Sequence, residues 1–171
     1  MEKLINVAGV VNDSIVDGVG LRYVLFVQGC PRKCKGCHNA DTQPFVEKTL
    51  MTPTEIIEQI DSNPLLDGVT FSGGEPMCQA AALAPLAKMI KERGLHLAIY
   101  TGYTFEDLYS SDMLGVKELL SYADILIDGE FIEGLRDYTL KFRGSSNQRV
   151  IDVQESLRLS QTILVTSPKW L

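Results

Sequence analysis

Three cysteines stand within eight residues of the chain, in a segment that follows an apolar stretch typical of a strand. They are Cys30, Cys34 and Cys37. Thiolates at such spacing can bind a metal cluster, but a closed structural site needs four protein ligands. Three clustered thiolates leave one metal position free for a substrate or cofactor. The spacing therefore predicts a metal cluster with one open coordination position, at which chemistry can take place.

A non-catalytic module is the alternative interpretation of the same cysteines. Cys78 or His38 could supply a fourth ligand and close a zinc site for structure or protein binding. Cys78 lies two residues after Pro76, and we interpret it as a bystander thiol rather than a ligand. The identity of the fourth ligand separates the two interpretations, and the cysteines alone leave both open.

A second segment suited to ligand binding is the run Gly73-Gly74-Glu75-Pro76. Its two glycines allow the backbone to approach a ligand closely, and the Glu75 carboxylate can accept charge-assisted hydrogen bonds from an ammonium group. Such a run by itself is more often a turn than a binding site. Beside the three cysteines it indicates a site for a ligand that carries an ammonium group.

Strands alternate with helices along the chain, and each chemistry-bearing segment directly follows a predicted strand. Loops that leave the carboxyl ends of parallel strands share one face of an α/β fold, so these segments are expected to converge. The strands are too few for an eight-stranded barrel, and we expect a partial (β/α) barrel of about five or six mainly parallel strands. The predicted strands are 22–27, 68–71, 96–100, 124–127 and, more weakly, 162–165; the predicted helices are 52–60, with a Thr52/Glu55 capping box, 79–93 and 113–121.

Composition narrows the setting of this site. A chain of 171 residues, 45% hydrophobic and 22% charged, predicts one compact domain over 1–171. The net charge of −6 argues against a nucleic-acid partner. No apolar segment reaches the ~20 residues of a membrane span, and the amino terminus lacks a signal-peptide pattern. Clustered cysteines fit a reducing compartment, so we expect a cytoplasmic protein.

The two motifs together resemble the radical S-adenosylmethionine superfamily. Within it, the run 35–39, Lys-Gly-Cys-His-Asn, is most similar to the short activating enzymes of anaerobic ribonucleotide reductase. The resemblance covers about residues 7–153. Further similar segments are Asp17–Gly20 with Arg22, Tyr100–Thr104, Ile127–Phe131 and Arg143–Arg149.

This resemblance implies a glycyl-radical activase with one 4Fe-4S cluster and S-adenosyl-L-methionine as cofactors. Cys30, Cys34 and Cys37 would bind three irons, and the amino and carboxylate groups of S-adenosylmethionine would chelate the fourth. Reductive cleavage would give methionine and a 5'-deoxyadenosyl radical, which removes a hydrogen atom from a glycine of the reductase.

Further site residues follow from the same resemblance. Gly73 and Gly74 would contact the methionine end of the cofactor, with Glu75 near its ammonium group. Gly36 and His38, which flank the ligand Cys37, would lie against the nucleoside. Asp128 would either contact the ribose or methionine part or merely cap a turn; Arg143–Arg149 would bind cofactor or reductase, or form an ordinary polar loop.

The implied partners are the glycyl-radical subunit of anaerobic ribonucleoside-triphosphate reductase and a flavodoxin or ferredoxin as electron donor. Activases of pyruvate formate-lyase share the cysteine motif but carry Asp-x-Lys where this chain reads Asp128-Gly129-Glu130. Activation of pyruvate formate-lyase or another glycyl-radical enzyme is therefore the alternative within the enzyme class.

Overall fold

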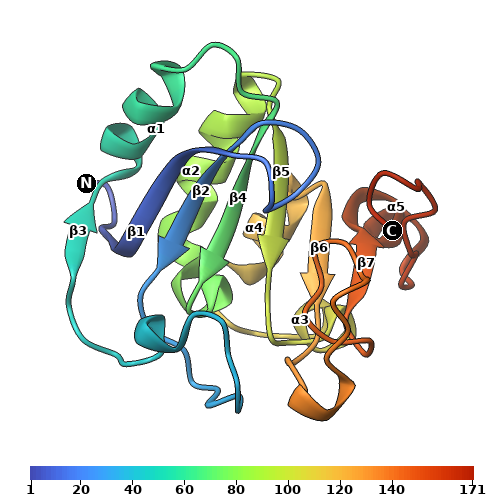
Figure 1. Cartoon of the computed structure of the whole chain (residues 1–171). Coiled ribbons are helices and arrows are strands. Elements are labelled where there is room, and N and C mark those ends of the chain that lie inside the picture. The colour runs from blue at the N-terminus through green and yellow to red at the C-terminus, as the bar shows by residue number, and fades with distance from the viewer.

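The computed structural model describes all residues, Met1–Leu171, and places seven strands in one sheet (Figure 1). The order across the sheet is β3-β1-β2-β4-β5-β6-β7. The strands are β1 Ile5–Ser14, β2 Arg22–Val27, β3 Thr49–Met51, β4 Gly68–Gly73, β5 His96–Tyr100, β6 Ile125–Asp128 and β7 Arg149–Asp152. The helices are α1 Pro53–Asp61, α2 Ala80–Glu92, α3 Phe105–Tyr109, α4 Val116–Tyr122 and α5 Val153–Leu159.

The centre of the sheet is parallel and its margins are antiparallel. β2, β4, β5 and β6 pair in parallel, whereas β1 pairs antiparallel with β2 and β3, and β7 pairs antiparallel with β6. The α/β fold with a mainly parallel core is confirmed, and the sheet stays open rather than closing into a barrel. None of the helices is long and apolar enough to cross a membrane.

The strand count differs from the expected five or six because three marginal strands lack a clear pattern. β3 and β7 have only three and four residues, and β1 is irregular, with register shifts on either side of its pairing with β2. The weaker strand prediction at 162–165 is wrong. This segment forms an isolated bridge, Ile151 with Leu164, so it contacts the edge of β7 without a regular ladder.

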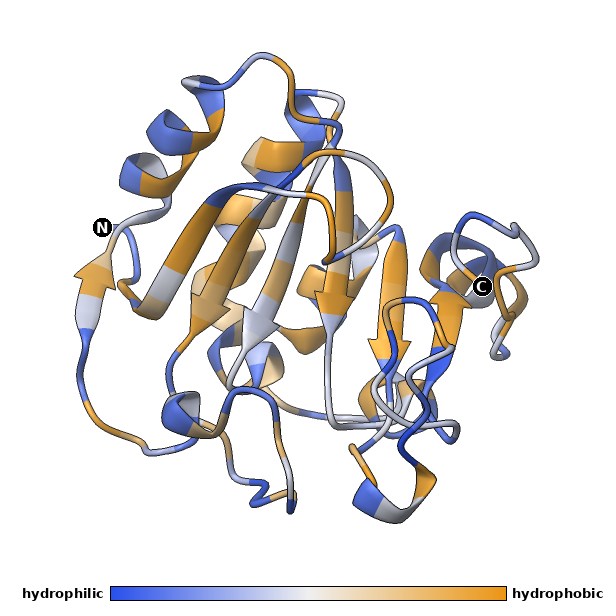
Figure 2. Ribbon diagram, viewed as in Figure 1, coloured by the Kyte–Doolittle hydropathy of each residue, from blue (hydrophilic) through white to orange (hydrophobic).

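The two faces of the sheet have different coverings, because successive side chains of a strand point to opposite sides. One face packs against α1, α2 and α4 (Figure 1) and contributes Leu25, Phe71 and Ile99 to the main core. The other face contributes Ala98 and Ile127 to a smaller cluster that includes Trp170. Figure 2 shows that the strands themselves are largely hydrophobic, as expected for a sheet buried on both faces.

Local signals fixed the helix boundaries well where they were strong. Thr52 caps α1 with a reciprocal capping box to Glu55, as predicted. The segment expected as a helix over 79–93 is a short 3-10 turn over Pro76–Gln79 followed by α2, which ends before Gly94 at φ +73°. The helices α3 and α5, of five and seven residues, are too short to show a clear period.

Candidate active site

A cavity of about 410 Å³ lies at the carboxyl ends of the parallel strands, where the loops after β2, β4, β5 and β6 meet. In Figure 1 these loops gather below the arrowheads of the sheet. Each of the four loops contributes to the wall of the cavity, as the positions after the strands predicted. Lining residues include Cys30, Cys34, Cys37, Gly74, Thr101 and Gly129.

The cysteine loop is closed on itself by backbone hydrogen bonds. Gly29 N donates to Thr42 O at 2.7 Å, and Cys30 N donates to Gln43 O at 2.9 Å. The end of the loop therefore returns beside its beginning, and all three thiols face one cavity with partial exposure. Closure by backbone contacts fixes the loop independently of any bound metal.

Burial raises the pKa of two of the three thiols, and one of these two donates a hydrogen bond to a carboxylate. Burial, assisted by the neighbouring Glu130 carboxylate, raises the pKa of Cys34 to about 11, and its Sγ donates to Glu130 Oε1 at 3.5 Å. Burial also raises the pKa of Cys30. No three His, Cys, Asp or Glu side chains are arranged to hold a metal ion. Three soft thiol donors on one cavity fit an iron-sulfur cluster, which would require loss of their protons and release of Cys34 from Glu130.

Gly73 and Gly74 allow two loops to approach each other closely. Gly73 has φ +96°, and a Cβ there would lie 2.5 Å from Val27 N. A Cβ on Gly74 would lie 2.3 Å from Gly29 O. The backbone nitrogens of Gly74 and Glu75 donate to Val27 O and Gly29 O, both at 2.8 Å. These glycines thus join the loop after β4 to the start of the cysteine loop, as well as lining the cavity.

Glu75 is buried and connects the loops after β4 and β5. Its Oε1 accepts hydrogen bonds from Met77 N at 3.0 Å and Thr101 Oγ1 at 2.8 Å, and its Oε2 accepts from Gly102 N at 2.8 Å. Burial raises the pKa of Glu75, opposed by these three donors. A carboxylate offers about four acceptor positions, so this group retains capacity for one donor from a ligand.

The remaining predicted residues divide between the cavity wall and positions behind it. His38 lines the cavity, with its ring centroid 5.5 Å from that of Phe131. Gly36, at φ +74°, lies outside the lining, and its carbonyl accepts from Arg136 Nη2 at 3.1 Å. The geometry therefore supports a ligand contact for His38 and offers none for Gly36.

Asp128 also lies outside the cavity lining. Its carboxylate is completely buried and accepts hydrogen bonds from Arg149 Nε at 3.0 Å and from Phe105 N at 2.7 Å. The alternation along β6 explains this position, because Ile127 faces the smaller cluster on the cavity side and Asp128 faces the opposite side. The structure gives Asp128 the capping role that the sequence offered as its alternative.

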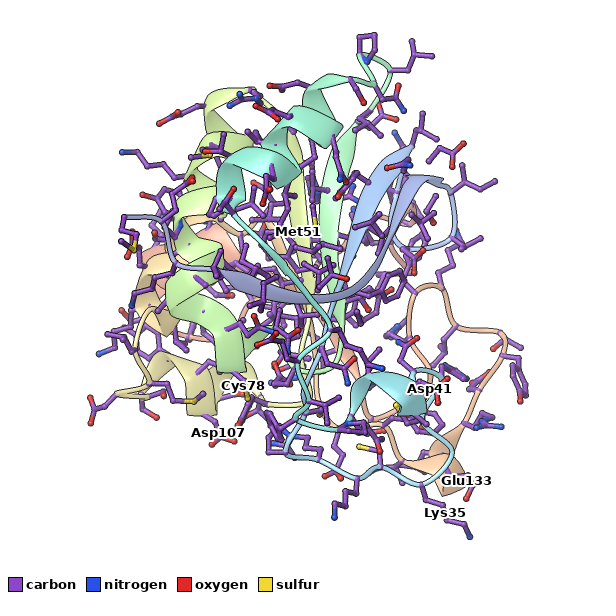
Figure 3. The ribbon with its side chains drawn as sticks, turned by 90° about the vertical axis from the view of Figure 1, so that its left-hand side faces the viewer. Lys35, Asp41, Met51, Cys78, Asp107 and Glu133 are labelled. Carbon is purple, nitrogen blue, oxygen red and sulfur yellow. The ribbon has the colours of Figure 1, made fainter.

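The segment after β6 supplies cavity residues that strand and helix patterns did not identify. Glu130 of this segment forms an ion pair of 3.3 Å with Arg32 of the cysteine loop. The guanidinium carbon of Arg32 also lies 4.7 Å from the centroid of the Tyr103 ring. At the tip of the cysteine loop, Lys35 and Glu133 form an ion pair of 3.5 Å, and Figure 3 shows the two side by side. The segment 129–148 therefore closes the cavity against the cysteine loop. Phe131, Phe142 and Arg143 are lining residues from this segment.

Comparisons with known proteins agree with this site. Residues 16–151 match the family described as a 4Fe-4S single cluster domain. The anaerobic ribonucleoside-triphosphate reductase-activating protein of Haemophilus influenzae is 34% identical over 144 residues, covering 78% of this chain and 89% of the relative. The chain belongs to this family of activating proteins.

Other members of the family are similarly close. The Escherichia coli K12 protein of that name is 33% identical over 80% of this chain and 91% of its own length, and the bacteriophage T4 protein is 35% identical over 79% and 86%. Membership confirms an iron-sulfur activating protein rather than a zinc module. The solved structure of QueE from Escherichia coli matches 73% of this chain and 69% of its own, at 18% identity and with a TM-score of 0.47.

Proposed function

We propose that this chain activates anaerobic ribonucleoside-triphosphate reductase by forming a glycyl radical on it. The observation that carries this proposal is the similarity to proteins named for that activity, which extends over 86–91% of their length in the relatives described above. The matched region includes the cysteine loop and the Gly73–Pro76 run.

Cys30, Cys34 and Cys37 would hold the 4Fe-4S cluster, and S-adenosylmethionine would bind in the same cavity against Gly73, Gly74, Glu75 and His38. When bound, these groups supply reductive cleavage of the sulfonium carbon–sulfur bond and abstraction of a hydrogen atom from glycine. Glu75, held by Thr101 and Gly102, would orient the ammonium group.

An open sheet suits a protein substrate. Because β3 and β7 are the outermost strands of an open sheet rather than neighbours in a closed barrel, the cavity could be reached by a loop of a larger protein. The electron would come from a flavodoxin or ferredoxin. Lys33 is exposed on the cysteine loop and takes part in none of the ion pairs, so it would favour an acidic donor.

The test is an anaerobic assay of the reduced protein with S-adenosylmethionine and a candidate glycyl-radical enzyme. We expect a glycyl radical signal by electron paramagnetic resonance on the ribonucleotide reductase and none on pyruvate formate-lyase. Methionine release without a radical on the ribonucleotide reductase would retain the chemistry and reject the substrate. A signal on pyruvate formate-lyase alone would establish the alternative activity.

Replacement of single cysteines tests the ligand set. We expect Cys34→Ala to abolish the ~400 nm absorption of a reconstituted 4Fe-4S cluster, because only two thiol ligands remain. Cys78→Ala is the matched control, since Cys78 lies outside the cavity lining, in the 3-10 turn that precedes α2 (Figure 3). A full complement of iron and sulfide in Cys34→Ala would contradict the assignment.

A further inference from the structure

Arg143 lines the proposed cofactor cavity as a cation without an acidic partner. It takes part in none of the ion pairs of the structure, and its only side-chain hydrogen bond runs from Nε to Lys141 O at 3.5 Å. The other arginine of the cavity, Arg32, already pairs with Glu130. Arg143 thus leaves most of its five N–H donors available to a ligand.

The residue before Arg143 has an unusual backbone conformation. Phe142 has φ +59°, in the left-handed region that a bulky side chain rarely adopts. Such a conformation persists only where surrounding contacts hold it, and it is concentrated at functional sites. Phe142 also lines the cavity, so the strained backbone turns the chain where Arg143 enters the wall.

Trp170 provides the contact that holds Phe142. The Trp170 ring packs edge-on against Phe142 with centroids 5.2 Å apart, stacks on His96 at 5.5 Å and lies 5.8 Å from the Arg22 guanidinium carbon. Only 7% of Trp170 is exposed. A second contact joins the same two segments, because Lys141 Nζ donates to Pro168 O at 3.0 Å.

The C-terminal segment 163–170 is also fastened to the edge strand β7 on the N-terminal side of Trp170. Val165 N donates to Val150 O at 2.9 Å, and Asp152 N donates to Ile163 O at 2.9 Å. This segment lies beyond residues 16–151, the region matched by the family model. Its contacts with Phe142 and Lys141 connect a segment outside the family match to the wall of the cavity.

The geometry points to Arg143 as a binding residue for the carboxylate of S-adenosylmethionine, with Trp170 as the positioning residue that holds Phe142 and so directs Arg143 into the cavity. This inference rests on the proposed function. A guanidinium presents a planar pair of donors that matches a carboxylate, and a hydrogen bond between two charged groups is about twice as strong as a neutral one. Glu75, in the same cavity, is suited to the ammonium group. The two residues would therefore bind the two charged groups on the α-carbon of the methionine part.

Binding of two ligands that differ only in the carboxylate tests Arg143. With cluster-reconstituted protein, equilibrium dialysis measures Kd for S-adenosylmethionine and for its decarboxylated analogue. We expect Arg143→Gln to weaken binding of S-adenosylmethionine by about ten- to a hundredfold and to leave the analogue within about twofold. Arg143→Lys should lose less, because it keeps the charge but not the planar pair of donors.

A matched control is Arg158→Gln, which makes the same chemical change on α5, where Arg158 pairs only with Glu155. Both Kd values should remain those of the unaltered protein. Equal weakening of both ligands by Arg143→Gln, or no weakening, would overturn the carboxylate assignment.

The ratio of the two Kd values also tests Trp170. We expect Trp170→Ala to reduce discrimination between the ligands by about threefold or more, whereas Trp170→Phe, which keeps an aromatic contact with Phe142, retains most of it. Lys169→Gln, at an exposed neighbouring position, is the control. A purely structural role would weaken both ligands in parallel, so an unchanged ratio in folded Trp170→Ala or Phe142→Ala protein would overturn the positioning role.

The two levels of the proposal fail in different ways. If the unaltered protein holds a cluster but binds neither S-adenosylmethionine nor the analogue, the proposed cofactor and the inference are both wrong. If it binds and discriminates the two ligands, and Arg143→Gln discriminates them equally well, the inference alone is wrong.

Discussion

Both ligand binding and the packing of two loops favour a glycine at position 74. In the sequence it belongs to a run suited to a ligand's ammonium group, whereas in the structure its missing Cβ lets the chain pass beside Gly29. The same contact sets the distance between the Glu75 loop and the first cysteine, because Glu75 N donates to Gly29 O. A glycine is therefore required here by the protein's own packing.

We expect Gly74→Ala to lower the free energy of unfolding by about 2 kcal/mol, because the new methyl group would meet backbone atoms that cannot move independently. Gly134→Ala is the control, since a Cβ at Gly134 would meet nothing within 4 Å and its φ is not positive. Urea unfolding measures both variants. A loss at Gly134 as large as that at Gly74 would contradict crowding as the cause, because backbone entropy alone makes Gly→Ala neutral or stabilising at an uncrowded position.

Arg149 connects three elements near the site. It stands at the start of β7, pairs with Asp128 at the end of β6 at 2.5 Å, and pairs with Glu106 in the first turn of α3 at 2.6 Å. Asp128 in turn accepts from the first backbone N–H of α3. This group of charges fixes the position of α3 and of the antiparallel strand β7 beside the parallel core.

The Glu106 carboxylate should make the free energy of unfolding depend on pH in the acidic range. Hydrogen bonds from Arg149 foremost, and from Thr162, lower the pKa of Glu106 to about 2. A lowered carboxyl pKa stabilises the fold above the unfolded value of about 4.3, and the stabilisation is lost as pH falls toward 2. Because 56% of the Glu106 side chain is exposed, we expect its ion pair with Arg149 to contribute only about 1 kcal/mol to the free energy of unfolding.

Urea unfolding of Glu106→Gln between neutral pH and pH 3 measures this dependence. The variant should be less stable at neutral pH and should lose less stability on acidification than the unaltered protein. Glu118→Gln, which removes an unpaired carboxylate of α4, should keep the original profile. A parallel decline in Glu106→Gln would exclude the Arg149 contact as its source.

The two faces of the sheet have different roles: one packs against the main hydrophobic core, and the other is next to the cavity. Helices and the main hydrophobic core cover one face, while the other carries the cavity at the carboxyl ends of the strands and the Trp170 cluster beneath it. The C-terminal segment therefore supports the cavity from the side that no helix covers. Folding of this segment should be inseparable from folding of the sheet.

We expect the cluster-free chain to unfold as one cooperative unit, as predicted for a single domain over 1–171. Trp170 is the only tryptophan, so its fluorescence reports on the C-terminal segment, while far-UV circular dichroism reports on the helices and sheet. The two urea transitions should coincide. An earlier transition in fluorescence would mean that the segment detaches independently, which would contradict a single unit.

The sequence alone determined the class of fold and indicated a metal site formed by the three cysteines. Strand and helix periods identified the parallel core because its strands are apolar and separated by well-capped helices, as at Thr52. The cysteine spacing and the Gly73–Pro76 run are local in the chain, so their chemistry can be read from the order of residues. The irregular β1 and the short β3 and β7 could not be predicted in this way, since pairing with neighbours rather than local pattern maintains them.

Only the tertiary structure decided which side of the sheet each polar residue faces and what holds it there. Asp128 is the last residue of β6 and lies next to the loops of the other site residues, yet the alternation of β6 directs its carboxylate to Arg149 instead of the cavity. Arg143 lies in a polar loop whose direction depends on Trp170, a residue distant in sequence. Contacts of this kind are set by packing between segments far apart in the chain, for which a single sequence contains no local signal.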